Sequence, residues 1–150
     1  MEHYYSKEQT STVKLKEINA FLRGKPFRFY LSGGLFSKSK VDFGTELLCK
    51  YMKLKKNWTV LDLGCGAGIV GIVASRFVKR VYLTDINKRA CEVSLINAKL
   101  NDCKNTAVIQ SDVFDGVGDV FFDCILLNPP QTAGKKLCFR MIQESKDHLK

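Results

Sequence analysis

Apolar positions along the chain follow two different spacings, and the alternation of these spacings predicts the secondary structure. Four runs are mostly apolar and rich in β-branched or aromatic residues, as buried strands are: 59–63, 80–85, 106–110 and 121–127. Four further segments are predicted as helices: 44–52, 69–78, 89–100 and 135–150. Strands that alternate with helices in this way predict an α/β domain with a mostly parallel sheet.

A different pattern precedes this alternation. Two partly alternating runs, 13–16 and 27–31, flank the turn residues Arg23-Gly24-Lys25-Pro26 and predict a β-hairpin, although 17–22 could instead form a short helix. Lysine and arginine side chains are interleaved here with phenylalanine and tyrosine, a combination that can bind RNA, while such aromatics more often face a core. We therefore divide the chain into a basic N-terminal segment with a hairpin, 1–31, and a main domain, 32–150.

The strand at 59–63 runs into a glycine-rich turn. Gly64, Gly66 and Gly68 occupy alternate positions, and an apolar helix follows them. Glycines allow positive φ angles and close approach of a ligand, and the helix presents free N–H groups, so the arrangement is typical of a nucleotide-cofactor site. Gly66-x-Gly68-x-x-Gly71 also fits the dinucleotide fingerprint, but Asp62 argues against a pyrophosphate there. A ligand with cationic groups, such as S-adenosylmethionine, suits an acid at this position.

The stretch Asp62-Leu63-Gly64-Cys65-Gly66-Ala67-Gly68 resembles the first motif of class I S-adenosylmethionine-dependent methyltransferases. Residues 34–48 also resemble the segment that precedes this motif in the methyltransferase small domain family, which implies that Phe36, Lys40 and Thr45 lie near the cofactor. The resemblance implies a doubly wound, mostly parallel, Rossmann-like sheet. A complete domain of this kind continues with a fifth strand and an antiparallel hairpin, so we expect 32–150 to be a C-terminally truncated methyltransferase domain.

Two further strand ends carry acids. Asp85 ends the strand 80–85 roughly twenty residues after the glycines, where it can accept hydrogen bonds from both hydroxyls of a ribose, with Ile86 against the adenine. The alternative is that Asp85 caps the next helix. Asp112 follows the third strand, and the resemblance implies that it accepts from the adenine amine while the Val113 N–H reaches a ring nitrogen. A simple turn-forming aspartate is the alternative for Asp112.

The fourth predicted strand runs into Asn128-Pro129-Pro130. The Asn128 side-chain oxygen and the Pro129 carbonyl can each accept one N–H of a planar amine, which turns the nitrogen lone pair toward a methyl donor. Orientation and electrostatics would then drive the transfer without a general base. A plain proline strand terminator is the competing interpretation.

This Asn-Pro-Pro motif resembles that of methyltransferases acting on guanine N2 in ribosomal RNA, adenine N6 in nucleic acids, or the glutamine amide of release factors. The methyltransferases that act on adenine N6 or on the glutamine amide usually have an aromatic residue where this chain has Gln131. We therefore expect the methylated atom to be guanine N2 of ribosomal RNA. The alternatives are a protein-glutamine N5 or DNA adenine-N6 methyltransferase, or a truncated, non-catalytic module that binds the cofactor or RNA.

The composition of the chain indicates which kinds of partner the protein can bind. Lys and Arg number 24 against 15 Asp and Glu, a formal net charge of +9 that suits a polyanion such as RNA, although a merely soluble basic surface is the alternative. No apolar stretch approaches ~20 residues, so we expect no membrane span. Six scattered cysteines without a C-x-x-C pair, and only two histidines, predict no metal site and a reduced, cytoplasmic protein. The oligomeric state is not predicted.

The candidate site is thus defined by two groups of residues. Catalytic roles are predicted for Asn128, Pro129 and Pro130. Cofactor contacts are predicted for Asp62, Gly64, Cys65, Gly66, Gly68, Asp85, Ile86, Asp112, Val113 and Asn128.

Overall fold

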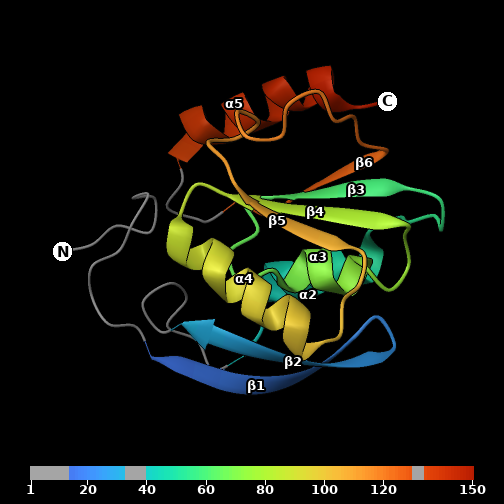
Figure 1. The fold of residues 1–150 in the computed structure, drawn as a ribbon, viewed down its shortest axis with the longest axis vertical. Helices are drawn as coiled ribbons and strands as arrows, with labels where there is room; N and C mark the ends of the chain where they lie inside the picture. The colour runs from blue at the N-terminus through green and yellow to red at the C-terminus, as the bar shows by residue number, and fades with distance from the viewer. Residues whose placement is uncertain (1–13, 33–39, 130–133) are drawn as a thin grey trace.

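A four-stranded parallel sheet forms the centre of the protein (Figure 1). The computed structural model describes residues 14–32, 40–129 and 134–150. The sheet has the order β5-β4-β3-β6, and its strands are β3 (Thr59–Leu63), β4 (Arg80–Asp85), β5 (Thr106–Gln110) and β6 (Cys124–Leu127). The four predicted strands and their parallel pairing are confirmed. Only β6 is shorter than expected, because Phe122 pairs with Leu149 instead of continuing the ladder.

Helices cover both faces of this sheet. Figure 1 shows α2 (Phe43–Tyr51), α3 (Ile69–Ala74) and α4 (Lys88–Leu100) below the strands, and α5 (Gly134–Ser145) with the short 3₁₀ turn η2 (Lys146–His148) above them. The predicted helix 69–78 ends at Ala74, since the N–H groups of Arg76 and Phe77 bond to carbonyls only three residues back, which tightens the last turn.

The predicted N-terminal hairpin is confirmed. Strands β1 (Leu15–Leu22) and β2 (Lys25–Ser32) pair antiparallel around the two-residue turn Arg23-Gly24. Both turn residues have positive φ, 51° and 78°, as the tight turn that matches strand twist requires. The alternative of a short helix over 17–22 is wrong, because β1 runs through these residues.

The hairpin forms an additional layer beneath the helices and shares their core. Its inward side chains are apolar and pack with those of α3 and the lower face of the sheet: Ile18, Leu22, Phe27, Phe29 and Leu31. The aromatic residues of the segment therefore divide between two roles, since Phe27 and Phe29 are buried whereas Phe21 is 74% exposed on the outer face.

Asn97 of α4 and Asn101, the C-cap of that helix, bond to the second edge of β2. The Arg28 N–H donates to Asn101 Oδ1 at 3.1 Å, and Asn101 Nδ2 donates back to the Arg28 carbonyl at 2.7 Å. Asn97 makes the same pair of bonds with Tyr30, at 2.7 and 3.0 Å, and its amide also donates to the Ala67 carbonyl at 2.8 Å. These side chains replace a neighbouring strand and link the hairpin to the glycine turn.

Replacing Asn97 by alanine is expected to lower the free energy of unfolding by about 2–4 kcal/mol, because the Tyr30 peptide groups and the Ala67 carbonyl lose their partner in a buried site. Urea unfolding measures the loss. The matched control, Asn57→Ala on an exposed loop, should change stability by less than about 0.5 kcal/mol. Equal midpoints for the two variants would contradict the structural role of Asn97.

Candidate active site

The carboxyl ends of all four sheet strands meet at one edge. Leu63 of β3 pairs in register with Thr84 of β4 and with Leu127 of β6, and Asp85 pairs with Gln110 of β5. The residues that follow these strands are therefore neighbours, in the order of the sheet. This places the polar residues singled out from the sequence along a single edge of the sheet.

A pocket of about 90 Å³ lies at this edge, and we call it the carboxyl-edge pocket. Five of the predicted cofactor residues line it: Gly64, Asp85, Ile86, Asp112 and Val113. Helix α5 covers the pocket with Leu137 and Met141. The volume of the pocket is smaller than the range of about 300–1,000 Å³ usual for small-molecule pockets, and the side chains of α5 form part of its wall.

An exposed ion pair joins α5 to the loop after β5. Arg140 Nη1 lies 3.1 Å from Asp112 Oδ1, and Arg140 Nε lies 2.6 Å from Glu144 Oε2. The Arg140 and Asp112 side chains are 40% and 44% exposed, so solvent screens this pair and it contributes little to holding the helix in place. The Asp112 carboxylate, predicted to meet an adenine amine, is occupied by Arg140 here.

The glycine turn requires positive φ angles, which residues with a Cβ rarely adopt. Gly66 and Gly68 have φ of 56° and 85°. A Cβ added to Gly68 would lie 2.9 Å from the Ser94 hydroxyl oxygen, which is closer than real Cβ contacts allow. The turn is therefore packed tightly against α4 on its inner side, and neither Gly66 nor Gly68 lines the pocket.

Asp85 fastens the glycine turn to the end of β4. Its carboxylate accepts from the Gly66 N–H at 2.9 Å and from the Asn87 N–H at 2.9 Å, and it lines the carboxyl-edge pocket. The alternative that Asp85 caps α4 is wrong, because Asn87 is the capping residue and accepts from the Ala90 N–H at 3.1 Å. The predicted contact of Asp85 with a ribose stays a prediction.

Asp62 and Cys65 lie behind the turn rather than in the pocket. Asp62 is 4% exposed and accepts from the Gly71 N–H in the first turn of α3 at 2.8 Å. The Cys65 thiol lies 3.3 Å from the Ser94 hydroxyl, and burial raises its pKa well above the ordinary value. Both side chains therefore support the turn from beneath, and a contact between either of them and a ligand remains a prediction.

Burial makes the Asp62 carboxyl sensitive to pH. Removal from water raises its pKa from 3.8 to about 7, the hydrogen bond from Gly71 opposes this, and the charge of Asp85 adds to it. Between pH 3.8 and about 7 the unfolded chain ionises this group while the folded chain keeps it protonated. The free energy of unfolding should therefore fall as pH rises through this window, by on the order of 4 kcal/mol from this group.

The measurement is urea unfolding from pH 4 to pH 8 for the unmodified protein and for Asp62→Asn. The variant should lack this part of the decline, since its amide oxygen can still accept from Gly71 but no longer ionises. Parallel pH profiles for the two proteins would show that Asp62 titrates normally in the folded state.

Asn128 lies one strand beyond the pocket, and a chain of hydrogen bonds orients it. Thr45 Oγ1 donates to Asp42 Oδ2 at 3.0 Å, and Asn128 Nδ2 donates to Thr45 Oγ1 at 2.9 Å. A carboxylate only accepts, so the single hydroxyl proton of Thr45 goes to Asp42, and Thr45 must accept from the Asn128 amide. The network therefore turns the NH₂ of Asn128 toward α2, and its oxygen has no hydrogen-bond partner among the residues that the structure describes.

The remaining predicted residues are placed as follows. Pro129 is half-buried beside Asn128, and Lys40 is exposed ahead of α2. Pro130, Gln131 and Phe36 lie outside the described residues. Thr45 contacts Asn128 and is not among the residues that line the carboxyl-edge pocket, so its implied place near the cofactor stays a prediction.

Sequence reasoning missed three features of the site. Asp42 is the N-cap of α2 and accepts from the Thr45 N–H at 2.9 Å, which the Asp-x-x-Thr spacing ahead of an apolar helix could have indicated. Thr84 is among the residues that line the pocket, and its hydroxyl is buried with no hydrogen-bond partner among the described residues. Val113 has a φ of 55°, a conformation that a β-branched residue adopts only at a cost of about 1–2 kcal/mol.

The described residues also bear on metal binding, membrane-spanning helices and reactive thiols. The part of the chain that the structure covers contains no group of His, Cys, Asp and Glu side chains able to hold a metal ion. None of its helices is long and apolar enough to cross a membrane. All six cysteines are free thiols, and burial raises the pKa of Cys49 to about 12 and of Cys91 to about 11.

Comparison with known proteins places this geometry in a family. The model of the methyltransferase small domain matches residues 26–150. The chain is 42% identical to the uncharacterized protein YbxB of Bacillus subtilis, over 99% of this chain and 76% of that protein. It is 36% identical to ribosomal RNA small subunit methyltransferase C of Pasteurella multocida, over 78% of this chain but only 36% of that protein. The chain thus spans about a third of the length of the named methyltransferases that it matches.

Solved structures share the fold. The 16S rRNA N2 G1207 methyltransferase (RsmC) of T. thermophilus, solved with AdoMet and guanosine, has a TM-score of 0.82 at 22% identity, covering 93% of this chain and 40% of that chain. This likeness confirms the Rossmann-like arrangement of the sheet expected from the sequence. With the family model matched over 26–150, more than half of the chain, the protein belongs to the methyltransferase small domain family.

Proposed function

We propose that the protein transfers a methyl group from S-adenosylmethionine to the N2 amine of a guanine in ribosomal RNA. The observation that carries this proposal is the placement of Asn128 one strand away from the carboxyl-edge pocket, with a side-chain oxygen that accepts from none of the described residues. The family and the names of its ribosomal RNA methyltransferase relatives support the reaction class and the substrate.

The residues of the pocket fit this cofactor chemically. Thr84 offers a buried hydroxyl that a polar ligand group would satisfy, and Asp85 offers carboxylate oxygens at the pocket wall. The positive φ of Val113 presents its peptide group at a fixed angle beside Asp112. When bound, the cofactor would supply an electrophilic methyl group on its sulfonium.

The chain would contribute orientation rather than a base. Asn128 Oδ1 and the Pro129 carbonyl would each accept one N–H of the guanine amine, so that the nitrogen lone pair faces the methyl group. The nitrogen would form its bond to carbon as the carbon–sulfur bond breaks, and the extra proton would leave to water. Asp42 and Thr45 keep the Asn128 amide from rotating, which favours this one geometry.

Transfer assays with radiolabelled S-adenosylmethionine test the substrate. We expect the label in small-subunit ribosomal RNA, recovered as N2-methylguanosine after digestion to nucleosides. We also propose that the protein acts in the cytoplasm. Label in duplex DNA as N6-methyladenine, or in a release factor as methylglutamine, but not in ribosomal RNA, would favour the alternative substrates. Cofactor binding by calorimetry without transfer to any of the three would favour a non-catalytic module.

A further inference from the structure

The positive charge of the protein is concentrated in four short loops. Residues 23–25, 53–58, 76–80 and 101–105 contain nine Lys or Arg and a single acid, Asp102. The other 131 residues hold fifteen Lys or Arg and fourteen Asp or Glu, so their formal net charge is only +1. Nearly all of the +9 of the chain therefore belongs to these four loops, which we call the basic edge.

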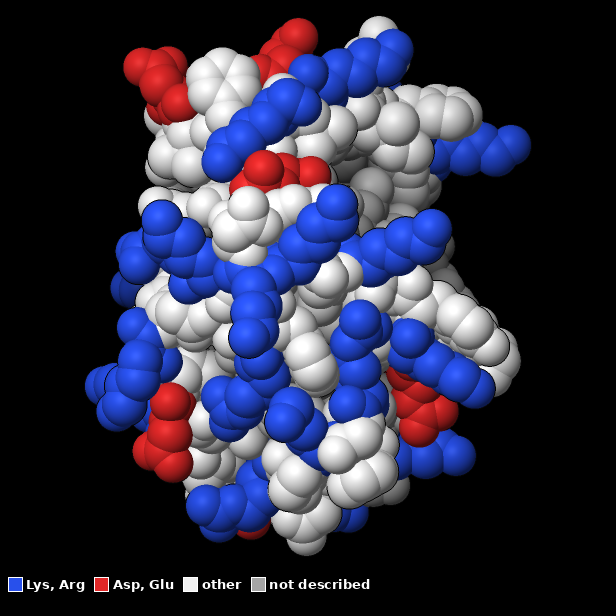
Figure 2. All heavy atoms as spheres, turned by 90° about the vertical axis from the view of Figure 1, so that its right-hand side faces the viewer, with Lys and Arg blue, Asp and Glu red and all other residues white. Residues whose placement is uncertain are grey.

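The four loops are neighbours at the amino ends of the sheet strands. The N–H groups of Lys79 and Arg80 both donate to the Trp58 carbonyl, and the Asn105 amide donates to carbonyls of Val78 and Lys79. The turn of the hairpin joins them, because the Arg23 guanidinium lies 5.0 Å from the centre of the Phe77 ring. Figure 2 shows the result as a face crowded with lysine and arginine side chains.

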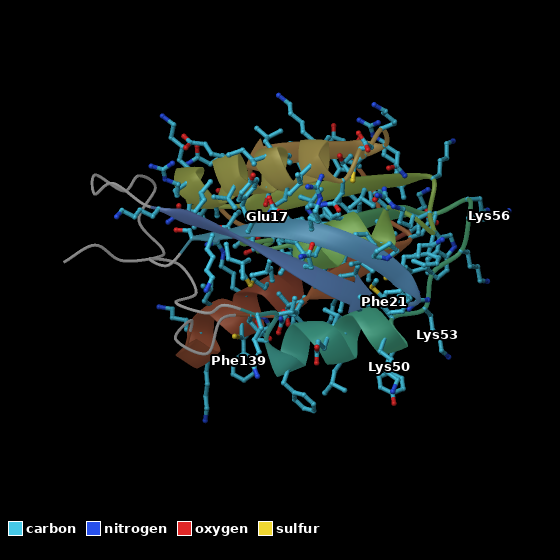
Figure 3. All side chains as sticks on the ribbon, turned by 90° about the horizontal axis from the view of Figure 1, so that it is seen from below. Glu17, Phe21, Lys50, Lys53, Lys56 and Phe139 are labelled. Atoms are coloured by element: carbon cyan, nitrogen blue, oxygen red, sulfur yellow. The ribbon has the colours of Figure 1, made fainter. Side chains whose placement is uncertain are left out.

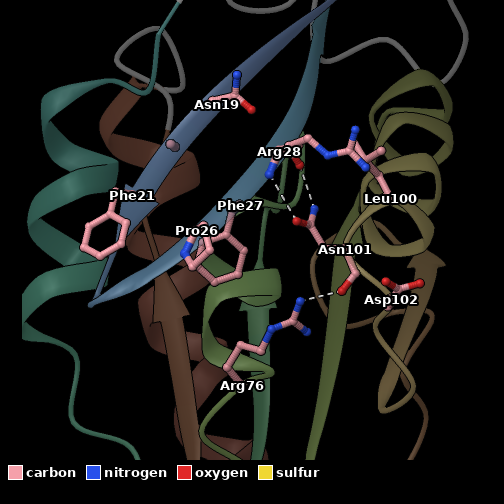
Figure 4. Close-up of a pocket in the computed structure, with 10 residues that line it drawn as sticks. Asn19, Phe21, Pro26, Phe27, Arg28, Arg76, Leu100, Asn101 and Asp102 are labelled. Carbon is pink, nitrogen blue, oxygen red and sulfur yellow. Dashed lines mark hydrogen bonds between the residues drawn. The ribbon is translucent and has the colours of Figure 1, made fainter.

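A groove of about 690 Å³ opens beside the basic edge. It runs between the outer side of the hairpin and the end of α4, with Phe21 and Pro26 on one side and Asp102 on the other (Figure 4). Arg28 and Arg76 line it, and the guanidinium of Arg76 is held by the Asn101 carbonyl. Figure 3 shows Phe21 toward the same end of the molecule as Lys53 and Lys56.

We propose that the basic edge and this groove bind a single-stranded segment of RNA, at the end of the sheet opposite the carboxyl-edge pocket. Charge complementarity argues for a polyanion, because eight of the nine cationic side chains are exposed and only one acid lies among them. The 74% exposed Phe21 ring argues for unpaired bases, which stack on such a surface, whereas paired bases cannot. The inference rests on the proposed RNA substrate but not on the transfer chemistry.

Hydrogen bonds to the protein hold two of the arginines of the basic edge in place. Arg23 donates to the Cys49 carbonyl at 2.9 Å, and Arg76 is fixed by Asn101, so two of the cations are ordered rather than freely solvated. Ordered guanidinium groups lose less conformational entropy on binding a phosphate. The exposed lysines around them add attraction that depends on salt.

Two triple variants with equal loss of charge test the proposal. The edge variant carries Lys53→Gln, Lys56→Gln and Lys79→Gln, and the control carries Lys88→Gln, Lys99→Gln and Lys146→Gln, all six positions being exposed. Binding of a fluorescent single-stranded RNA is followed by anisotropy over a series of salt concentrations. We expect the edge variant to bind about tenfold more weakly or worse, with the slope of log K against log salt reduced by about two.

The ring of Phe21 is tested separately. Phe21→Leu should weaken RNA binding about tenfold, and Phe21→Tyr should restore it, because a tyrosine ring still stacks. Equal RNA affinity of the edge and control variants would overturn the proposal. So would a loss of binding to anionic phosphatidylserine vesicles without a loss of RNA binding, which would indicate a membrane surface instead.

These measurements separate the inference from the proposed function. RNA binding is measured without S-adenosylmethionine, and the cofactor affinity of both triple variants should remain that of the unmodified protein, since neither changes the carboxyl-edge pocket. Binding that depends on the basic edge, combined with no methyl transfer to RNA, would overturn the proposed function alone. Transfer to RNA with no role for the basic edge would overturn this inference alone.

Discussion

Asn128→Ala should lower kcat for methyl transfer by about 100- to 1,000-fold while the Kd for S-adenosylmethionine changes less than about threefold. The alanine removes the oxygen that would orient the target amine, and Asn128 is not among the residues that line the carboxyl-edge pocket. Single-turnover assays give the rate of transfer, and calorimetry gives the affinity. A variant that kept its rate would remove Asn128 from the proposed mechanism.

Thr45 provides a control that leaves Asn128 in place. Thr45→Val keeps the shape of the side chain but no longer accepts from the Asn128 amide, so the amide is free to rotate and kcat should fall about tenfold. Thr45→Ser retains the hydroxyl and should restore most of the rate. Equal rates for Thr45→Val and Thr45→Ser would show that the hydrogen-bond network does not position Asn128.

Asp85→Ala should weaken S-adenosylmethionine binding by about 1.5–3 kcal/mol, or roughly 10- to 150-fold in Kd, the range for hydrogen bonds to a charged group. The carboxylate lines the pocket, and it also accepts from the Gly66 and Asn87 N–H groups, so the alanine variant loses some stability as well. Calorimetry below the unfolding temperature of the variant separates the two effects.

Asp62→Asn is the matched comparison for Asp85→Ala. Asp62 is buried behind the same turn and does not line the pocket, so Asp62→Asn tests its predicted cofactor contact: without that contact the Kd stays within about threefold. An unchanged Kd for Asp85→Ala would remove the ribose role of this residue. If Asp62→Asn instead weakened cofactor binding strongly, the cofactor would depend on the glycine turn that Asp62 supports rather than on the residues of the pocket wall.

The strands and the glycine turn are predictable from the sequence because each depends on local chemistry. Residues 59–63 and 80–85 are short, apolar and bounded by turn residues, and the structure has the same bounds. The hairpin follows from its turn, since Arg23-Gly24 adopts the positive φ angles that a two-residue connection needs. The end of α3 is not predictable in this way, because it depends on a change from four-residue to three-residue hydrogen bonds.

The contacts that shape the site escape sequence reasoning because they join distant segments. Asn128 and Thr45 are 83 residues apart, so nothing local connects them. Asp62 and Leu63 alternate across the strand, and only the packed structure shows that the Asp62 side of β3 faces α3 while Leu63 lines the pocket. The positive φ of Val113 contradicts the preference of valine, so the residue type gives no signal of this conformation.

The paired asparagines toward the C-terminal end of α4 constrain how the hairpin can vary in length. Asn97 and Asn101 are four residues apart, about 6.0 Å along a helix, and their partners Tyr30 and Arg28 are two residues apart, about 6.6 Å along a strand. These two spacings, along the helix and along the strand, match in only one register. A one-residue insertion within β2 would shift the strand by about 3.3 Å, and both asparagine amides would lose the peptide groups that they bond. Natural or engineered insertions in this hairpin should therefore be tolerated at the Arg23-Gly24 turn and rejected along the strand.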